Sequence, residues 1–381
     1  MALRGLNACA RIILTDASRA AVGALQSDCL KCRHGAKRHL LSEDVVKLQD
    51  FQQKKIAVAH RVSGSKGYYF ETIHRKIEKN ELILKEELKI LLHLCQSAED
   101  VIMARNAIYR YHKENSNMAF GEFKFGPLFM RLCYELGLEE LAATTLTDPA
   151  LKGFFPDSTS FNIAIDMLFT KQCYESCLDV VGEMKKQGVP FNKDTFILAF
   201  ATCYKLNTSM SYHICLTLLE EGQTKGILIP RHAYCFATAL ALKQNDIERA
   251  QIFYSQIMST DSRLCLNLRV LILAMKGSMK EAISALTTAQ VSKTPVFVKK
   301  TEFSQEVVNE LRKKSADGLW EGRVEQVLRR LEEAGQITKK TLDDFLCQTP
   351  SRKRRPLGIL EQERNISRRT LKHLQSALLL E

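Results

Sequence analysis

The sequence predicts an all-α fold: a solenoid of helix-turn-helix repeats with a C-terminal helical cap and a flexible basic arm. The first observation is a small residue that returns at intervals of 32 to 38 residues. The second is that apolar residues around it recur three and four positions apart, as on one face of an α-helix. A period close to 35 residues is typical of paired helices that stack into a solenoid. The recurring small residues are Ala104, Ala142, Cys177, Cys215, Ala250 and Ala282.

Residues 1–35 have the composition of a mitochondrial transit peptide. Arg4, Arg11 and Arg19 are separated by apolar stretches, and acidic residues are scarce. An Arg-rich amphipathic helix of this kind directs a chain to mitochondria, whereas a secretory signal needs a continuous apolar core. The other interpretation is an ordinary amphipathic first helix. We expect a protein of the mitochondrial matrix, and no apolar stretch is long enough to predict a transmembrane segment.

Net charge is concentrated at the two ends of the chain. The whole sequence carries +12, of which residues 1–40 contribute +5 and residues 293–381 contribute +6. The middle of the chain is therefore almost neutral. A basic excess favours a polyanionic partner such as RNA or an anionic membrane surface. The plainer interpretation is a targeting peptide together with solubility.

Twelve cysteines are scattered without a disulfide framework. Most lie among Leu, Ile or Phe, which predicts small buried side chains in a reducing compartment. Cys29, Cys32 and His34 resemble a metal motif, but a closed zinc site needs four ligands and no second pair follows. We therefore expect neither a metal nor a cofactor.

Residues 36–87 predict an N-terminal region of helices and loops. Gly and Ser residues between Val62 and Tyr68 indicate a loop. A helix is expected between Glu78 and Leu94, with one apolar face formed by Leu82, Leu84, Leu88, Leu91 and Leu92.

The solenoid is expected over residues 88–290, and its clearest repeat is 158–192. Asp157 is placed to cap the first helix, and Gly188 is placed to end the second in the left-handed conformation. Cys177 is small enough to let the two helices approach closely. The expected buried side chains are Phe161, Ile165 and Leu168 in the first helix and Cys177, Val180, Val181 and Met184 in the second.

Specific stretches of this repeat are similar to a known family. They are Ser160-Phe161-Asn162, Tyr174-Glu175, Cys177-Leu178 and Glu183–Val189, and two other segments repeat the middle part, Gly137–Ala142 and Gln244–Ala250. With these residues the chain resembles the pentatricopeptide repeat family over about 88–290. Tetratricopeptide repeats are the nearest alternative, and the ending Glu-Met-Lys-Lys-Gln-Gly-Val argues against them.

The resemblance implies an organellar RNA-binding protein. Such a protein acts in the maturation, processing or stability of mitochondrially encoded transcripts and so supports the respiratory chain. In the family, two or three side chains of each repeat read one base. The reading positions are the fifth and the last, which are Asn162 and Asn192 in the best repeat.

These two amides present both donors and acceptors to a base edge, and the family pattern implies a preference for a pyrimidine. The other interpretation is that Asn162 caps or solvates its helix and Asn192 lies in a turn. Ile197 and Cys235 hold the fifth position of the next two repeats and cannot form amide bonds to a base. We therefore do not expect a complete base-by-base code, and recognition by shape, stacking and phosphate contacts remains open.

A basic and aromatic cluster is expected at the end of one second helix. It consists of Tyr109, Arg110, Tyr111, His112 and Lys113. Bases stack on aromatic rings in single-strand binders, so Tyr109, Arg110 and Lys113 are candidate stacking and phosphate contacts. The alternative is that part of the cluster packs in the core.

Residues 291–347 predict helices that cap the open end of the solenoid. Val324, Val327, Leu328 and Leu331 form the apolar stripe of one of them. Residues 348–381 form a basic arm and a last helix. Prolines bracket the run Arg352, Lys353, Arg354 and Arg355, which predicts an exposed, phosphate-binding arm. A nuclear localisation signal and a solvated linker are the alternatives.

No catalytic motif is present, and we expect no enzyme activity. The chain lacks His-Glu-x-x-His, Gly-x-Ser-x-Gly and a Gly-rich phosphate loop. Asp343 and Asp344 are more simply a helix surface than part of a nuclease site. The expected partner is single-stranded mitochondrial RNA, with RNA-processing enzymes or the mitochondrial ribosome as further partners. The alternative is a protein-binding scaffold such as a mitochondrial ribosome-associated factor, which the near-neutral repeats favour.

Overall fold

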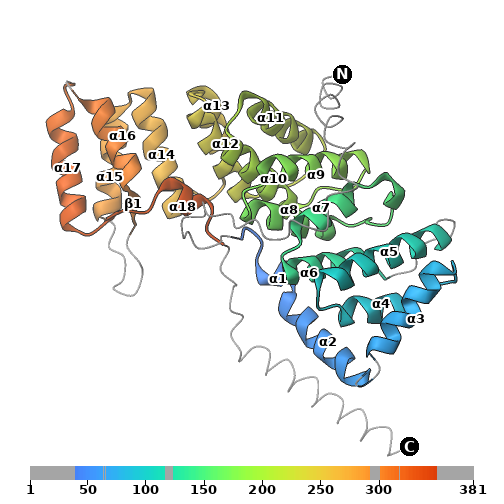
Figure 1. The fold of residues 1–381 in the computed structure, drawn as a ribbon. Helices are drawn as coiled ribbons and strands as arrows, with labels where there is room; N and C mark the ends of the chain where they lie inside the picture. Colours follow the sequence, from blue (N-terminus) through green and yellow to red (C-terminus); the bar gives the residue numbers. More distant parts are fainter. Residues whose placement is uncertain are drawn as a thin grey trace, which may run out of the picture. The chain divides into compact units, whose positions relative to one another are not determined.

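A computed structural model describes residues 39–62, 64, 66–115, 123–291, 301–316 and 318–349. These residues form eighteen α-helices, one 3-10 helix and two short strands (Figure 1). The predicted transit peptide, 1–35, lies outside the described residues. So does the predicted basic arm beyond Thr349.

The repeats are pairs of antiparallel helices, and seven such hairpins follow one another. The first helices are α4 (Lys85–Leu94), α6 (Gly126–Leu136), α8 (Ser158–Thr170), α10 (Lys193–Leu206), α12 (Arg231–Lys243), α14 (Arg263–Lys276) and α16 (Gln305–Ser315). The second helices are α5 (Ala98–Asn115), α7 (Glu139–Thr147), α9 (Tyr174–Lys186), α11 (Ser209–Thr224), α13 (Ile247–Ser255), α15 (Met279–Val291) and α17 (Glu321–Glu333).

Further elements flank or interrupt these hairpins. They are α1 (Glu43–Val46), α2 (Leu48–Arg61), α3 (Lys66–Glu78), η1 (Pro149–Leu151), β1 (Phe303–Ser304), β2 (Ile337–Thr338) and α18 (Leu342–Leu346). Helix α2 packs on α4 and α6, and α3 packs on α5. Strands β1 and β2 pair in parallel, with Phe303 opposite Ile337.

The predicted solenoid is confirmed by the positions of its small residues. Each lies on the second helix of a different hairpin and is buried. A small side chain there lets the paired helices approach closely, and a larger one would force them apart. The six residues are Ala104, Ala142, Cys177, Cys215, Ala250 and Ala282.

First helices pack on one another in a continuous row from α4 to α16. We call these helices the first-helix row. The second helices pack on their own first helix and, for most repeats, on the first helix of the next hairpin. Figure 1 shows this succession of hairpins along the repeats.

Helix ends follow the predicted capping pattern. The Asp157 carboxylate accepts from the backbone N–H of Ser160 at the start of α8, and Gly188 adopts φ 73° after α9. Asp246 and Ser262 cap α13 and α14 in the same way. A capping side chain supplies a partner for an N–H that the helix itself leaves unpaired.

The C-terminal helical cap is also confirmed. Helices α16 and α17 bury their apolar faces against α14 and α15 in a second core cluster that includes Phe303. The predicted stripe of α17 is buried as expected, with Val324, Val327, Leu328 and Leu331 inside.

One helix prediction was wrong in its extent. Helix α4 begins at Lys85, and the preceding Leu82 and Leu84 are 57% and 54% exposed. Two residues that are two positions apart lie about 200° apart around a helix, so they cannot share one face. Of the predicted face only Leu88, Leu91 and Leu92 are buried, and His93 and Leu94 of the same helix are buried with them.

Candidate nucleic-acid interface

The fold brings the two predicted base-reading asparagines into direct contact. Asn162 lies on α8, and its Nδ2 donates to Oδ1 of Asn192 at 3.0 Å. Asn192 is the N-cap of α10, because the same Oδ1 accepts from the backbone N–H of Thr195 at 2.9 Å. Thr195 Oγ1 donates in turn to Oδ1 of Asn162 at 2.8 Å. Residues from two successive repeats thus form one hydrogen-bonded group.

Solvent access differs between these two amides. Asn162 is fully buried, whereas Asn192 is half-buried. Nδ2 of Asn192 donates to Ser158 Oγ at 2.9 Å, so both amides have partners within the protein. Asn192 is therefore accessible from solvent, whereas Asn162 is not.

Two residues of the predicted basic-aromatic cluster hold α5 against its neighbours. The Tyr109 hydroxyl donates to the Asp148 carboxylate, and burial together with this bond raises the pKa of Tyr109 to about 12. Arg110 donates through Nη1 to Asn80 Oδ1 at 3.2 Å and pairs with Glu114 on its own helix. Both side chains therefore have structural partners where the sequence predicts RNA contacts.

Of the remaining predicted phosphate contacts, the structure describes only Lys113. Lys113 is exposed in the last turn of α5. The run Arg352, Lys353, Arg354 and Arg355 lies outside the described residues.

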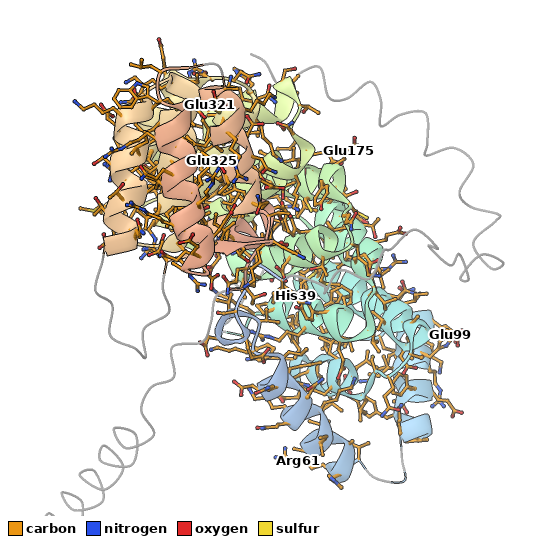
Figure 2. The ribbon with its side chains drawn as sticks, turned by 90° about the vertical axis from the view of Figure 1, so that its left-hand side faces the viewer. His39, Arg61, Glu99, Glu175, Glu321 and Glu325 are labelled. Carbon is orange, nitrogen blue, oxygen red and sulfur yellow. The ribbon has the colours of Figure 1, made fainter. Side chains whose placement is uncertain are left out.

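Sequence reasoning missed a contact that covers α8. The fully buried carboxylate of Asp166 accepts from the backbone N–H groups of Leu40 at 2.7 Å and Leu41 at 3.2 Å. His39 Nδ1 lies 2.9 Å from the other carboxylate oxygen. We call His39–Leu41 the N-terminal segment, and Figure 2 shows His39 beside the repeat helices. A hydrogen bond between residues that lie 126 positions apart has no local sequence signal.

A second covering contact comes from the other end of the described chain. Helix α18 packs on α12 and α14, and Leu342, Phe345 and Leu346 are buried there. Just beyond α18, Thr349 Oγ1 donates to the backbone carbonyl of His39 at 2.6 Å. The N-terminal segment and the residues after α18 therefore meet over the first-helix row.

Asn267 is a second polar residue of this row that sequence reasoning missed. It holds the fifth position of α14, as Asn162 does in α8. Its Nδ2 donates to the Glu302 carbonyl at 2.9 Å, and its Oδ1 accepts from the Ser304 N–H at 2.8 Å. A signal was available, because Cys235 is the fifth residue of its first helix and Asn267 is the fifth residue of the next first helix. Glu302 and Ser304, just before and within β1, therefore satisfy both the donor and the acceptor of this amide.

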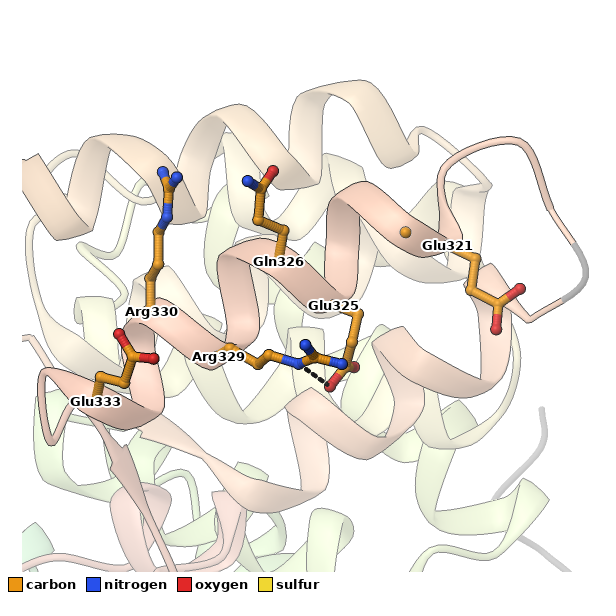
Figure 3. A pocket seen from close by; sticks show the side chains of 7 residues that line it. Glu321, Glu325, Gln326, Arg329, Arg330 and Glu333 are labelled. Carbon is orange, nitrogen blue, oxygen red and sulfur yellow. Dashed lines mark ion pairs between the residues drawn. The ribbon is translucent and has the colours of Figure 1, made fainter.

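A shallow hollow of about 640 Å³ along α17 does not resemble a binding site. All of its lining residues come from this one helix, and they include both acidic and basic side chains (Figure 3). Glu325 and Arg329 pair across it at 3.6 Å. Opposite charges on an open surface contribute little to binding or stability.

The described residues were searched for a metal site and for a membrane-spanning helix. Within them no group of three or more His, Cys, Asp or Glu side chains is arranged to hold a metal ion. In the same part of the chain no helix combines the length and apolar character needed to cross a membrane.

Comparison with known proteins matches this chain to one family model and to full-length relatives. The sequence model of the family described as mitochondrial 28S ribosomal protein S27 matches residues 15–349. Pentatricopeptide repeat-containing protein 2, mitochondrial, of Danio rerio is 73% identical and covers 100% of both chains. The protein of the same name from Homo sapiens is 48% identical over 94% of this chain and 93% of its own.

A crystal structure of the pentatricopeptide repeat protein PPR10 from maize matches 80% of this chain and 56% of its own, with 11% identity and a TM-score of 0.31. The fold assignment stands instead on the helical hairpins described above. The curated relatives are mitochondrial proteins, and mitochondrial localisation holds for this chain too. With full-length identity of 73% to one of them, the chain belongs to the pentatricopeptide repeat-containing protein 2 family of mitochondria.

Proposed function

We propose that the protein binds single-stranded RNA in the mitochondrial matrix and acts in the maturation, processing or stability of mitochondrially encoded transcripts. Respiratory chain function would depend on it through those transcripts. Membership of a pentatricopeptide repeat family supports the proposal. The observation that carries it is the contact between Asn162 and Asn192, the two base-reading positions of the best repeat, at 3.0 Å.

In this proposal Asn192 makes the first contact with a base, because its side chain is half-buried and Asn162 is closed to solvent. Opening of the amide pair then frees the donor of Asn162 for the same base. Tyr109, Arg110 and Lys113 on α5 are further candidate contacts for rings and phosphates. Cations and stacked rings together are the usual way in which proteins hold single strands.

The test is crosslinking of the protein to RNA in intact mitochondria, followed by sequencing. The key variant is Asn192→Asp, which keeps the capping oxygen and removes the amide donor. We expect the crosslinks of the unmodified protein to be focused on one transcript. In Asn192→Asp the crosslink at a single base should be weaker, and the thermal stability should be unchanged. The matched control is Asp157→Asn, the reverse exchange at the N-cap of α8. Equal crosslinking by all three proteins would contradict base reading by Asn192.

The cationic run tests the phosphate part of the proposal. Replacing Arg352, Lys353, Arg354 and Arg355 by Gln removes four candidate phosphate contacts. The slope of log affinity against log salt should then fall by about 3, because each contact with a single strand contributes about 0.7. An unchanged slope would exclude this run from the RNA contact.

A protein-binding scaffold is the second candidate function. It is favoured by the burial of Asn162 and by the match to a family described as a mitochondrial ribosomal protein. Crosslinks spread over ribosomal RNA, together with co-sedimentation with the small ribosomal subunit, would support this candidate over the first.

A further inference from the structure

Three successive first helices each present a hydrogen-bond donor that is satisfied by an oxygen of the chain's own C-terminal region. Lys205 of α10 donates to both carboxylate oxygens of Asp343 at 2.7 Å. His232 of α12 contacts the Leu346 carbonyl through Nε2 at 2.6 Å. On α14 the donor is Arg263, whose Nη1 lies 3.0 Å from the Glu302 carboxylate. The donors belong to the repeats, and every acceptor belongs to residues 302–346.

Aromatic rings lie beside these donors. Lys243 Nζ lies 3.7 Å from the centre of the Tyr204 ring, which joins the C-terminal ends of α10 and α12. The His232 ring stacks on Phe236 with centres 4.9 Å apart and planes 15° apart. Tyr204 itself is buried, and its ring also contacts Phe236 with centres 5.8 Å apart.

Cations next to aromatic rings are the chemistry that binds single-stranded nucleic acid. Phosphates and base carbonyls offer oxygen acceptors and no positive charge. Helix α18 and its neighbours offer the same atoms, a carboxylate at Asp343 and a backbone carbonyl at Leu346. Both ligands would satisfy the same donors, and they cannot do so together.

We propose that α18 is an internal ligand of an RNA-binding surface on α10 and α12, and that RNA binds there by displacing it. The inference rests on the proposed function, since it gives the RNA a second contact surface and a means of control. We call Lys205, His232 and Tyr204 the covered surface, and the exposed side chain of Lys243 lies beside it, against the Tyr204 ring. Helix α18 has only five residues, and a segment this short detaches more readily than a full hairpin of the solenoid.

The test uses the full chain and a labelled 20-nucleotide oligouridine. RNA should raise the amide exchange of Leu342–Leu346 at least 5-fold in the unmodified protein. Asp343→Asn weakens the hold of Lys205 on α18 and should tighten RNA binding 3- to 10-fold. Adding Lys205→Gln should remove that gain, because the freed cation is then absent.

The matched control is Glu248→Gln on the exposed side of α13, which changes the net charge as Asp343→Asn does. It should alter RNA affinity less than 2-fold. Circular dichroism of each variant separates loss of folding from loss of binding, and the exchange measurement on the unmodified protein needs no mutation at all.

The outcomes separate the inference from the function on which it rests. RNA binding with unchanged exchange in α18, and equal affinity for Asp343→Asn, overturns the inference and leaves the proposed function standing. Absence of RNA binding by every variant overturns both. Release of α18 by an acidic peptide but not by RNA assigns the covered surface to a protein partner and overturns the RNA assignment.

Discussion

The first and second helices of the repeats differ in how many of their sides are buried. In α8 ten consecutive residues, Ser160–Phe169, are buried, and in α12 the same holds for Ala233–Leu242. Their partners bury single stripes. Helix α9 buries four residues, Cys177, Val180, Val181 and Met184, and α13 buries Ala250 and Phe253.

A helix with one buried stripe faces solvent on its other side, whereas a helix buried all round lies inside the protein. The second helices are therefore the outer layer of the repeats. The first-helix row is covered on a further side by the N-terminal segment at Asp166 and by α18 at His232. Repeat proteins generally use an open face of the array to bind ligands. Here the chain itself covers part of the first-helix row, at Asp166 and at His232.

The largest expected effect comes from removing the hydrogen bonds that hold the N-terminal segment on α8. Asp166→Ala removes the acceptor of two backbone N–H groups and leaves them buried without a partner. Each unsatisfied buried donor costs about 1–3 kcal/mol, so we expect a loss of about 3 kcal/mol in unfolding free energy. Urea denaturation followed by circular dichroism measures the loss.

Asp179→Ala on α9 is the matched control in the same hairpin. Asp179 is exposed on the second helix, and a surface substitution there should change stability by less than about 0.5 kcal/mol. Similar losses for the two variants would contradict the distinction between the covered and the outer layer.

Two glycines sharpen the same comparison. A Cβ on Gly126 of α6 would lie 2.8 Å from the Phe155 ring and even closer to Ser160, whereas a Cβ on Gly182 of α9 meets nothing within 4 Å. Gly126→Ala should therefore destabilise the protein by about 2 kcal/mol through overpacking. Gly182→Ala should stabilise it by about 0.5–1 kcal/mol, because alanine loses less entropy in a helix.

The thermal midpoints of both variants check this prediction. The same exchange of glycine for alanine should lower the thermal midpoint at Gly126 and raise it at Gly182. Two shifts of the same sign would contradict the difference in packing between the first-helix row and the second helices.

The repeats could be predicted because their signals are local. Cys177, Gly188 and Asp157 act through their immediate neighbours, and a helix cap or a small contact residue can be recognised within a few positions. The stripe of α17 was predictable for the same reason, since Val324, Leu328 and their partners recur at the helical period.

The covering contacts could not be predicted, because they join residues far apart in the sequence. Lys205 and Asp343 are separated by 138 positions, and neither residue has a neighbour that marks it. The hydrogen bonds of the buried Asn162 likewise join it to Asn192 and Thr195, which lie 30 and 33 positions away. One available signal was missed, because a helix such as Ala233–Leu242 with almost no polar residue already indicates burial on all sides.

The smallest expected effect concerns pH and the contact between His232 and α18. Burial lowers the pKa of His232 below its ordinary value of 6.5, against a smaller opposing effect of the Leu346 carbonyl. The unfolded chain therefore takes up a proton at a pH where the folded chain does not. Stability should fall as the pH decreases below about 6.5, because the state that binds more protons is favoured by acid.

His232→Gln keeps a donor for the Leu346 carbonyl and removes the titration. Its stability should depend less on pH between 7.5 and 5.5 than that of the unmodified protein, although His93, whose pKa burial also lowers, preserves part of the dependence. Thermal unfolding at several pH values measures the difference. Amide exchange of Leu342–Leu346 over the same range locates it, since acid should loosen α18 before the hairpins unfold. Parallel pH profiles for the two proteins would show that the His232 contact with α18 is not sensitive to protonation.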